Sequence, residues 1–325
     1  MRRALITGVS GQDGRHLVKL LLEHDYEIVG TVSKPNSIAA VKELFHSSKV
    51  TIIYADLTDS VSLTEIVKKY KPIEIYNLGA LSHVGLSFDE PELTANVTGL
   101  GALRVLDAVR NSGMQDSIKI YQASSSEMFG RVSESPQNEE TPFNPISPYG
   151  IAKTFAHNTC RSYREMYGIR VSCGILFNHE GEFRGHEFVT RKITSNVARI
   201  ALGYQKTFSL GNLDARRDWG YAGDYVEAMW KMMKSDKSND YVIATGETHS
   251  VSDFLLTALE VAGLEKNLEK YVTFDPQMKR PQETNLLVGD PSRALKQLDW
   301  RAEKSFHDLV LLMVENDLRI ERSFK

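Results

Sequence analysis

The apolar positions in the first half of the chain form short runs that are separated by longer amphipathic segments. Runs rich in Ile, Val, Leu and Tyr are typical of buried β-strands and cover residues 4–7, 26–32, 50–54, 74–78, 118–123 and 170–177. Apolar side chains recur at helical spacing over residues 16–24, 60–69, 93–109 and 149–167. Because strand and helix alternate, the pattern predicts an α/β fold with a doubly wound parallel sheet.

The pattern changes after residue 177. Residues 178–217 are polar, apart from a predicted helix at 191–202 and a predicted short strand at 207–210. A further apolar run covers 241–244, and an amphipathic closing helix covers 306–320. We therefore expect two interleaved lobes: residues 1–177 plus about 218–246, and a smaller C-terminal substrate-binding lobe of residues 178–217 plus about 247–325.

A glycine-rich turn directly follows the first predicted strand, and a leucine-rich helix follows the turn. Glycine lets the backbone approach a pyrophosphate closely, and the dipole of the helix then favours the phosphate charge. This order predicts a Rossmann-type dinucleotide site. Its predicted cofactor contacts are Thr7, Gly8, Gly11, Gln12, Asp13 and Gly14.

The end of the second strand indicates which dinucleotide binds. Enzymes that use NAD usually place a carboxylate there for the adenosine ribose, whereas a cation suits the extra phosphate of NADP. Residues 33–36 contain no carboxylate and offer Lys34, so we expect NADP, with NAD as the alternative. The next two strands end in further predicted cofactor contacts, which are Asp56, Leu57, Leu78 and Ala80.

Tyr149 and Lys153 lie four residues apart in the predicted helix 149–167. This spacing places both side chains on one helix face. A neighbouring ammonium and a cationic nicotinamide would favour the phenolate and lower the pKa of Tyr149 from its usual value near ~10. Tyr149 is therefore a predicted acid–base group, and both residues are predicted catalytic and cofactor-binding residues.

Hydroxyl groups and a carboxylate follow the strand at 118–123, at the edge where open α/β sheets bind ligands. We predict catalytic roles for Ser125 and Glu127. Ser126 remains an alternative to Ser125, because either serine could simply form the turn.

Composition and charge exclude several classes of partner. The 325 residues carry a net charge of −3 with mixed signs along the sequence, so we expect no nucleic-acid partner. Cys160 and Cys173 have neither paired nor metal-like spacing, and we expect a metal-free protein in a reducing compartment. No run of 18 apolar residues occurs, and the N-terminus is too short for a signal peptide, so we expect a cytoplasmic protein without membrane contact.

Several longer motifs resemble one enzyme family. The turn at 7–14, together with Tyr149 and Lys153, is similar to the extended short-chain dehydrogenase/reductase superfamily. Within it, residues 122–127, 174–180, 188–192 and 211–219 resemble GDP-mannose 4,6-dehydratases, and the resemblance covers almost the whole chain.

The resemblance implies a lyase that is redox-neutral overall. Tyr149 would take the proton of the sugar's 4-hydroxyl while hydride leaves carbon 4, with Ser125 bound to the developing ketone and Lys153 to the cofactor ribose. Glu127 would then remove the carbon 5 proton and assist loss of the 6-hydroxyl as water, before hydride returns to carbon 6. The product would be a GDP-4-keto-6-deoxy sugar.

The resemblance also implies contacts with the GDP-sugar. Arginine matches a diphosphate through its forked donors, and a carboxylate accepts hydrogen bonds from guanine or ribose. The implied substrate contacts are Ser82, Asn178, Val189, Lys192, Arg217, Arg280 and Glu283. Arg216 stays open, and His83, His179 and His186 suit structural roles as well as ligand contacts. Members of the superfamily usually pair helices like 93–109 and 149–167, so a homodimer or homotetramer is expected.

Four places differ from the family pattern. Residues 33–36 replace an arginine pair that contacts a neighbouring subunit's cofactor, and residues 181–183 replace a usual Ser-Pro. Leu81 replaces glutamine, and Asn285 replaces aspartate. We expect these differences near the sugar and nucleotide, which makes a GDP-manno-heptose an alternative substrate. An NADPH-dependent reductase or epimerase of a GDP-keto sugar is a second alternative, but it needs no carboxylate at Glu127.

Overall fold

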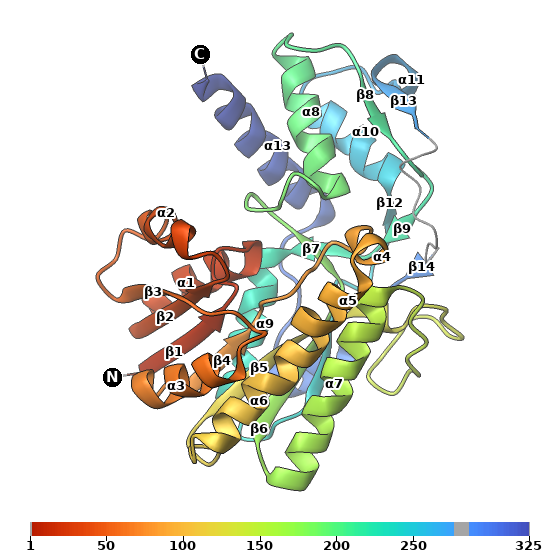
Figure 1. Cartoon of the computed structure of the whole chain (residues 1–325). Helices are drawn as coiled ribbons and strands as arrows, with labels where there is room; N and C mark the ends of the chain where they lie inside the picture. The colour runs from red at the N-terminus through yellow and green to blue at the C-terminus, as the bar shows by residue number, and fades with distance from the viewer. Residues whose placement is uncertain (1, 276–285, 325) are drawn as a thin grey trace.

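The first lobe is built on a parallel β-sheet. A computed structural model describes residues 2–275 and 286–324, and in these residues a sheet of seven strands runs parallel throughout. The strands are β1 (Arg2–Thr7), β2 (Tyr26–Val32), β3 (Val50–Tyr54), β4 (Glu74–Asn77), β5 (Lys119–Ser125), β6 (Arg170–Leu176) and β11 (Asp240–Ile243). The order β11-β6-β5-β4-β1-β2-β3 confirms the predicted doubly wound fold (Figure 1).

Helices cover both faces of this sheet. One face packs against α1 (Gln12–Glu23), α9 (Ala222–Lys234) and α12 (Ser292–Leu298) through a core that includes Leu17, Met229 and Leu298. The other face packs against α3 (Ser60–Tyr70), α6 (Gly101–Asn111) and α7 (Pro148–Tyr167), with Val105 and Cys160 in its core. Burial of these apolar helix faces fixes the ends of the strands relative to one another.

The second lobe lies beyond the carboxyl edge of the sheet (Figure 1). Its helices α8 (Val189–Ala201), α10 (Val251–Val261) and α13 (Phe306–Ser323) share a separate core that includes Val197, Phe254 and Val310. Three small sheets of the described residues complete this lobe. Two of them have two strands each, β7 (Asn178–Glu180) with β10 (Trp219–Tyr221), and β8 (Phe208–Leu210) with β13 (Val272–Phe274). In the third, β9 (Arg216–Arg217) lies between β12 (His249–Ser250) and β14 (Leu286–Leu287).

The two lobes exchange segments. After β10 the chain returns to the first lobe through α9 and β11. Helix α12 lies in the range expected for the second lobe, but Ala294, Leu298 and Trp300 pack in the core of the first. The Trp300 Nε1–H also donates to the Asp224 carbonyl at 2.8 Å. A helix of seven residues has too short a periodic pattern to reveal this packing from sequence.

Some predicted elements differ in their ends or their regularity. The helix expected at 93–109 consists of α5 (Pro91–Thr94), a π-helical stretch at Ala95–Leu100, and α6. β5 continues to Ser125, and α1 already begins at Gln12, so the end of the glycine turn belongs to the helix. Shorter helices are α2 (Ile38–Glu43), α4 (Leu86–Asp89) and α11 (Leu268–Tyr271), with 3₁₀ turns at Pro35–Ser37 and Ser126–Met128. Among the described helices, none has the length and apolar character that crossing a membrane requires.

Candidate active site

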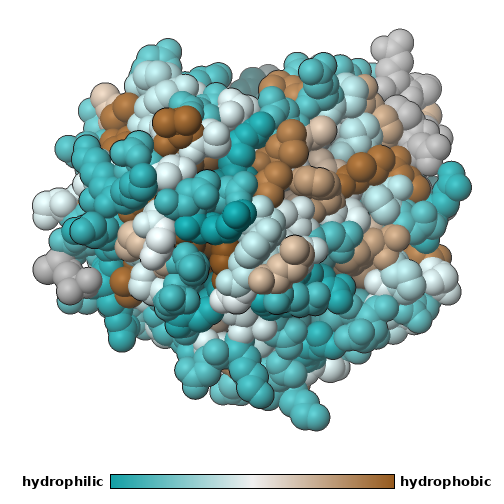
Figure 2. All heavy atoms as spheres, turned by 60° about the horizontal axis from the view of Figure 1, so that its bottom comes forward, coloured by the Kyte–Doolittle hydropathy of each residue, from teal (hydrophilic) through white to brown (hydrophobic). Residues whose placement is uncertain are grey.

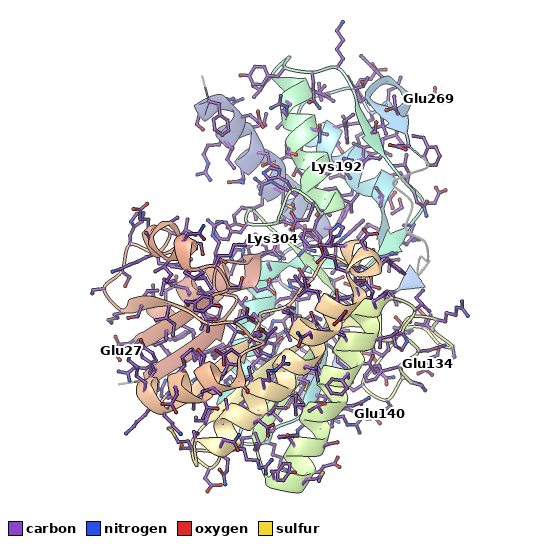
Figure 3. All side chains as sticks on the ribbon, viewed as in Figure 1. Glu27, Glu134, Glu140, Lys192, Glu269 and Lys304 are labelled. Carbon is purple, nitrogen blue, oxygen red and sulfur yellow. The ribbon has the colours of Figure 1, made fainter. Side chains whose placement is uncertain are left out.

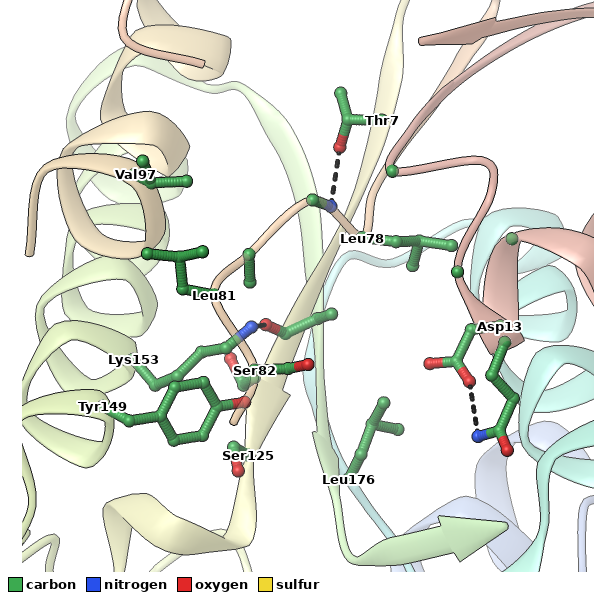
Figure 4. Close-up of a pocket in the computed structure, with 18 of the residues that line it drawn as sticks. Thr7, Asp13, Leu78, Leu81, Ser82, Val97, Ser125, Tyr149, Lys153 and Leu176 are labelled. Atoms are coloured by element: carbon green, nitrogen blue, oxygen red, sulfur yellow. Dashed lines mark hydrogen bonds between the residues drawn. The ribbon is translucent and has the colours of Figure 1, made fainter. Parts of the chain in front are cut away.

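A cavity of about 480 Å³ opens at the carboxyl edge of the sheet. Its walls come from the loops after β1, β4 and β5, from the start of α7 and from the segment after β6. Figure 4 shows Asp13 on one side of this space and Tyr149 with Lys153 on the other. Doubly wound sheets bind nucleotides at this position, and the volume suits a cofactor or substrate.

The ends of β1, β4 and β5 are joined by buried hydrogen bonds. Thr7 Oγ1 donates to Asn77 Oδ1 at 2.7 Å and accepts from the Gly79 backbone N–H at 3.0 Å. Asn77 Nδ2 donates to Gln122 Oε1 at 2.7 Å. Gly8 has a φ of +68°, and a Cβ there would lie 2.9 Å from Gly79 Cα. The backbone can therefore make this turn only because residue 8 is glycine.

The first turn of α1 faces the cavity. Gly11 precedes the helix, and no side chain caps its N-terminus. Gln12 and Asp13 line the cavity, and a Cβ on Gly14 would lie 2.5 Å from the Val9 carbonyl oxygen. The glycines thus allow close packing while leaving helix N–H groups available to an anion, which is the geometry that holds a pyrophosphate. These residues fit a dinucleotide.

The start of α7 directs Tyr149 into the cavity. Ser147 caps the helix by accepting the Gly150 N–H at 3.0 Å, and the Tyr149 N–H donates to Ser87 Oγ at 3.2 Å. The Tyr149 side chain is almost fully buried, and Ser125 lies close enough to its hydroxyl to lower the pKa of Tyr149. Figure 4 shows the phenol pointing toward Ser125. The structure therefore brings these two predicted catalytic residues together in one cavity.

Lys153 lies one helical turn beyond Tyr149 on the same face. Its ammonium donates to the Ala123 carbonyl at 2.7 Å and lies 5.7 Å from the centroid of the Tyr149 ring. Burial lowers the pKa of Lys153 to about 8. Burial also raises the pKa of Tyr149 well above its usual value, and the nearby Ser125 hydroxyl only partly opposes this shift. The raised pKa is contrary to the lowering expected from the sequence, because burial outweighs the nearby positive charges.

Glu127 reaches the same cavity from the end of β5. Ser125 has extended backbone, and its Oγ accepts the Glu127 N–H at 3.2 Å. Glu127 lines the cavity, and its carbonyl packs so closely on Gly150 that a Cβ there would lie 2.6 Å from the oxygen. Burial is the main cause of the raised pKa of Tyr149, and the negative charge of Glu127 also raises it. A carboxylate, a hydroxyl and a phenol therefore line one cavity.

A buried ion pair lies opposite Tyr149. His179 Nε2 is 2.9 Å from Asp13 Oδ2, and His179 Nδ1 is 2.8 Å from the Phe177 carbonyl. Both ring nitrogens face acceptors, so the imidazolium form satisfies both contacts. Burial opposes charge on each partner, yet their mutual attraction raises the pKa of His179 and lowers the pKa of Asp13 to about 2. Gln12 Nε2 also donates to the His179 carbonyl at 3.0 Å, which joins α1 to β7.

Arg184 supplies a second fixed charge at the cavity wall. Its Nε is 2.8 Å from Glu180 Oε2, and its guanidinium lies 3.5 Å from the centroid of the Phe188 ring. Burial and nearer groups have the larger effects on the pKa values of Asp13 and Tyr149. The positive charge of Arg184 acts to lower both pKa values. Arg184 is therefore positioned to attract an anionic ligand.

A family model for GDP-mannose 4,6 dehydratase matches residues 5–313 of the chain. The chain belongs to this family. The human GDP-mannose 4,6 dehydratase is 46% identical over 343 aligned residues, covering 98% of this chain and 92% of the human protein. The UDP-glucose 4-epimerase of Thermus thermophilus, solved in complex with NAD, superimposes with a TM-score of 0.85 at 25% identity, covering 97% and 98% of the two chains. The structure of RMD from Pseudomonas aeruginosa complexed with NADPH superimposes with a TM-score of 0.82 at 22% identity, covering 98% and 100%.

In this GDP-mannose 4,6-dehydratase family member, almost all of the predicted cofactor and catalytic residues line one cavity. The predicted contacts that line it are Thr7, Gly8, Gly11, Gln12, Asp13, Gly14, Asp56, Leu57, Leu78, Ala80, Ser125, Glu127, Tyr149 and Lys153. Among the described residues Lys34 is not part of the lining, but its neighbour Ser33 is. Lys34 is exposed just beyond the end of β2 and so lies outside the rim of this cavity.

The predicted substrate contacts are less closely grouped. Ser82 and Asn178 line the cavity, whereas Val189, Lys192 and Arg217 do not belong to its described lining. Val189 opens α8, and Figure 3 shows Lys192 on this helix in the second lobe. Arg217 lies in β9, where its Nη1 donates to the Arg216 carbonyl at 2.8 Å. Arg280 and Glu283, like Asn285, lie outside the residues that the structure describes.

The differences from the family pattern are not all near the cavity, contrary to expectation. Leu81 lines the main cavity, but Glu182 and Phe183 line another, of about 520 Å³, together with Arg15. The Arg15 guanidinium lies 3.7 Å from the centroid of the Phe183 ring. A Cβ on Gly181 would lie 3.3 Å from His16 Nε2. Residues 181–183 therefore pack on α1 and are not part of the described lining of the main cavity.

Several residues that line the cavity were not predicted from the sequence. They include Arg184 and Phe188, and also His179, for which a structural role was equally expected. Their position follows from the pairing of β7 with β10, which turns the segment after β6 back over α1. No local motif indicates the contact between Gln12 and His179, because these two residues lie more than 160 positions apart in the sequence.

Proposed function

We propose that the protein is a nucleotide-sugar 4,6-dehydratase that converts GDP-mannose into GDP-4-keto-6-deoxymannose. The observation that carries this proposal is the meeting of Glu127 with Ser125 and Tyr149 in one cavity. An ordinary short-chain reductase needs a hydroxyl, a tyrosine and a lysine. Elimination of water needs a further base, and Glu127 supplies it.

The first step is oxidation at carbon 4 of the sugar. NADP, when bound, accepts the hydride from carbon 4 and later returns it to carbon 6. Tyr149 accepts the proton of the 4-hydroxyl, and Ser125 donates a hydrogen bond to the ketone oxygen that forms. Burial keeps Tyr149 protonated in the protein alone, because its pKa is raised. The positive charges of Lys153 and of the oxidised cofactor favour the phenolate when the complex is complete.

The second step is elimination across carbons 5 and 6. The 4-ketone makes the proton on carbon 5 acidic, and Glu127 removes it. The same carboxyl group then returns a proton to the departing 6-hydroxyl, which leaves as water. When carbon 6 takes back the hydride, carbon 5 takes up one proton, which balances the proton that Tyr149 accepted from the 4-hydroxyl. Glu127 lies beside the backbone of Gly150, at the start of the helix that carries Tyr149. This contact supports the proposal that oxidation and elimination use one fixed arrangement of side chains.

The cofactor is NADP in this proposal. The turn from Thr7 to Gly14, together with Asp56, Leu57, Leu78 and Ala80, would hold the dinucleotide, and Lys34 would pair with its extra phosphate. Among the solved structures with a similar fold, one was determined with NADPH and others with NAD. The lack of a carboxylate in residues 33–36 favours NADP, and NAD remains the alternative.

The GDP portion lies between the cavity and the second lobe in this proposal. Ser82 contacts the sugar side, and Asn178, Val189, Lys192 and Arg217 contact the nucleotide, together with Arg280 and Glu283. Asp218, next to Arg217, supports this placement because it fixes the local backbone. Its carboxylate accepts the N–H groups of Thr245, Gly246 and Gly289 at 2.9, 3.0 and 3.2 Å.

The protein forms a homodimer or homotetramer in this proposal. Apolar side chains are exposed along the outer surfaces of the segments around α5, α6 and α7: Leu93, Leu100, Ile151, Phe155, Met166 and Tyr167. In Figure 2 apolar residues gather in the upper right of the face shown, between hydrophilic borders. Pairing of these helices with a second copy would remove this apolar surface from water. The absence of a nucleic-acid partner and a cytoplasmic location remain predictions.

The test is a product assay by mass spectrometry with catalytic NADP. Purified protein is offered GDP-mannose and a GDP-manno-heptose in parallel. Loss of one water from GDP-mannose, without accumulation of NADPH, is the expected result. The full-length similarity to GDP-mannose 4,6-dehydratases does not favour the heptose or the reductase. Water loss from the heptose alone would refute the mannose assignment, and accumulation of NADPH without loss of water would refute the lyase.

A further inference from the structure

A buried histidine continues the face of α7 that carries Tyr149 and Lys153. His157 follows Lys153 by four residues, so the three side chains lie on successive turns of one helix face. Its side chain is 1% exposed, and its Nδ1 lies 2.9 Å from Ser124 Oγ. Lys153 donates to the carbonyl of Ala123, the residue before Ser124, at 2.7 Å. Two successive turns of α7 are therefore joined to two successive residues of β5.

The other side of the His157 ring faces β6 and β11. His157 Nε2 lies 3.7 Å from Asp240 Oδ2 on β11, and one ring nitrogen of His157 lies within 4.8 Å of Cys173 Sγ on β6. Asp240 Oδ1 accepts from Arg164 Nη2 at 2.5 Å. Arg164 Nε donates to the Val171 carbonyl at 2.8 Å. The ring thus has partners on β5, β6 and β11, which fix its orientation between the helix and the sheet.

This cluster is not explained by metal binding. One ligand atom each of His157, Cys173 and Asp240 lies within 4.8 Å of the others, an arrangement that could hold an ion. The Arg164 guanidinium already contacts Asp240, and its Nη2 lies 3.9 Å from Cys173 Sγ. A cation is therefore present in the cluster, and the contacts form a closed polar network.

We propose that His157 is a positioning residue, which sets the distance between Tyr149 and Ser125 by fixing α7 against the end of β5. The Ser124 contact acts beside the Lys153 contact, so both turns of the helix are held at the residues that precede Ser125. The inference rests on the catalytic roles proposed for Tyr149, Ser125 and Lys153. It adds a residue that touches neither substrate nor cofactor.

Two substitutions at position 157 separate the Ser124 contact from simple packing. In His157→Asn the amide lies near the place of Nδ1 and keeps a hydrogen bond to Ser124, whereas in His157→Gln the longer side chain carries its amide toward Asp240. Ser124→Ala removes the same contact from the strand side. We expect His157→Gln and Ser124→Ala to lower kcat by roughly 10- to 100-fold, as small displacements of reacting groups do, with the KM for GDP-mannose changed by less than about threefold. His157→Asn should stay within about fivefold of the natural protein.

A titration with NADPH, followed by nicotinamide fluorescence, tests the inference without the sugar. Because Lys153 is held beside His157, His157→Gln should weaken NADPH binding about tenfold, and His157→Asn by less than about threefold. Melting temperatures of the variants show that they are folded. Natural kcat and NADPH affinity in His157→Gln would overturn the inference, as would equal losses in the Asn and Gln variants. If the natural protein fails to dehydrate GDP-mannose, the proposed function falls, and the NADPH titration still decides the role of His157.

Discussion

The two sides of the site differ in how their residues are brought together. On the cofactor side, Gly8, Gln12, Tyr149 and Lys153 come from two short stretches and all line the cavity. On the nucleotide side, Asn178 of β7 lines the cavity, but the other predicted contacts are spread over α8, β9 and residues beyond β13. The described ones among these others lie outside the cavity lining. The chemical groups are therefore placed by local structure, whereas substrate binding depends on how the second lobe packs.

This difference predicts which kinetic constant each region controls. Changes on the cofactor side should reduce kcat, because they remove groups that act on the reacting atoms. Changes in the second lobe should raise KM, because they remove contacts that stabilise the bound substrate and the transition state by the same free energy.

The largest effect is expected for Tyr149→Phe, which removes the proton acceptor. We expect kcat to fall by roughly 1,000-fold, within the range for loss of a positioned acid–base group. The matched control is Tyr163→Phe on the same helix, because its hydroxyl contacts Asp107 at 2.9 Å outside the cavity. Steady-state kinetics with circular dichroism measure both variants. A Tyr149→Phe enzyme within tenfold of natural kcat would contradict the mechanism.

Glu127→Gln should remove the elimination step and spare binding. We expect roughly 100-fold slower product formation, since the amide cannot act as a base, with little change in affinity for the GDP-sugar. Glu140→Gln is a suitable control because its carboxylate is exposed and contacts Arg293 at 2.6 Å. Single-turnover analysis by mass spectrometry should show the variant stalling before water is lost. Unchanged turnover would show that another group removes the carbon 5 proton.

Arg217→Lys tests the nucleotide side. The buried guanidinium is proposed to bind the diphosphate through two donors, and lysine cannot reproduce that fork. We expect KM to rise about tenfold with kcat nearly unchanged. Arg216→Lys, in the same strand but exposed, is the control and should behave like the natural protein. A fall in kcat without a rise in KM would remove the proposed division between the two sides.

The smallest effect concerns pH and the Asp13–His179 pair. The pKa of His179 is raised, so its contribution to stability is complete below the unfolded value of 6.5 and is lost as pH rises through the folded value. The pKa of Asp13 is lowered to about 2, so its contribution is complete above 3.8 and is lost as pH falls through about 2. We expect His179→Gln to cost on the order of 1 kcal/mol near pH 6, and less as pH rises. Urea unfolding without cofactor, from pH 5 to 9, measures this difference. An equal difference at every pH would contradict the assigned charge on His179.

The sequence was most informative where function depends on neighbouring residues. The turn at Gly8 and the pair Tyr149 and Lys153 each combine local backbone geometry with a short spacing, and both were predicted with the sheet that carries them. The extension of β5 to Ser125 and the early start of α1 at Gln12 changed only the ends of elements.

The remaining features depend on contacts between distant segments. His179 reaches Asp13 only because β7 turns back over α1, and His157 meets Asp240 only after β6 and β11 pair. The raised pKa of Tyr149 arises mainly from burial, which spacing along the chain cannot reveal. The packing of residues 181–183 against α1 likewise required the folded chain.

The central claim is that oxidation, elimination and reduction occur on one sugar without net use of the cofactor. Its most direct test uses GDP-mannose with deuterium at carbon 4 and catalytic NADP, with the product analysed by mass spectrometry and NMR. The account predicts loss of one water and deuterium at carbon 6 of the product. Deuterium recovered in free reduced cofactor, or a product that has lost no water, would contradict it.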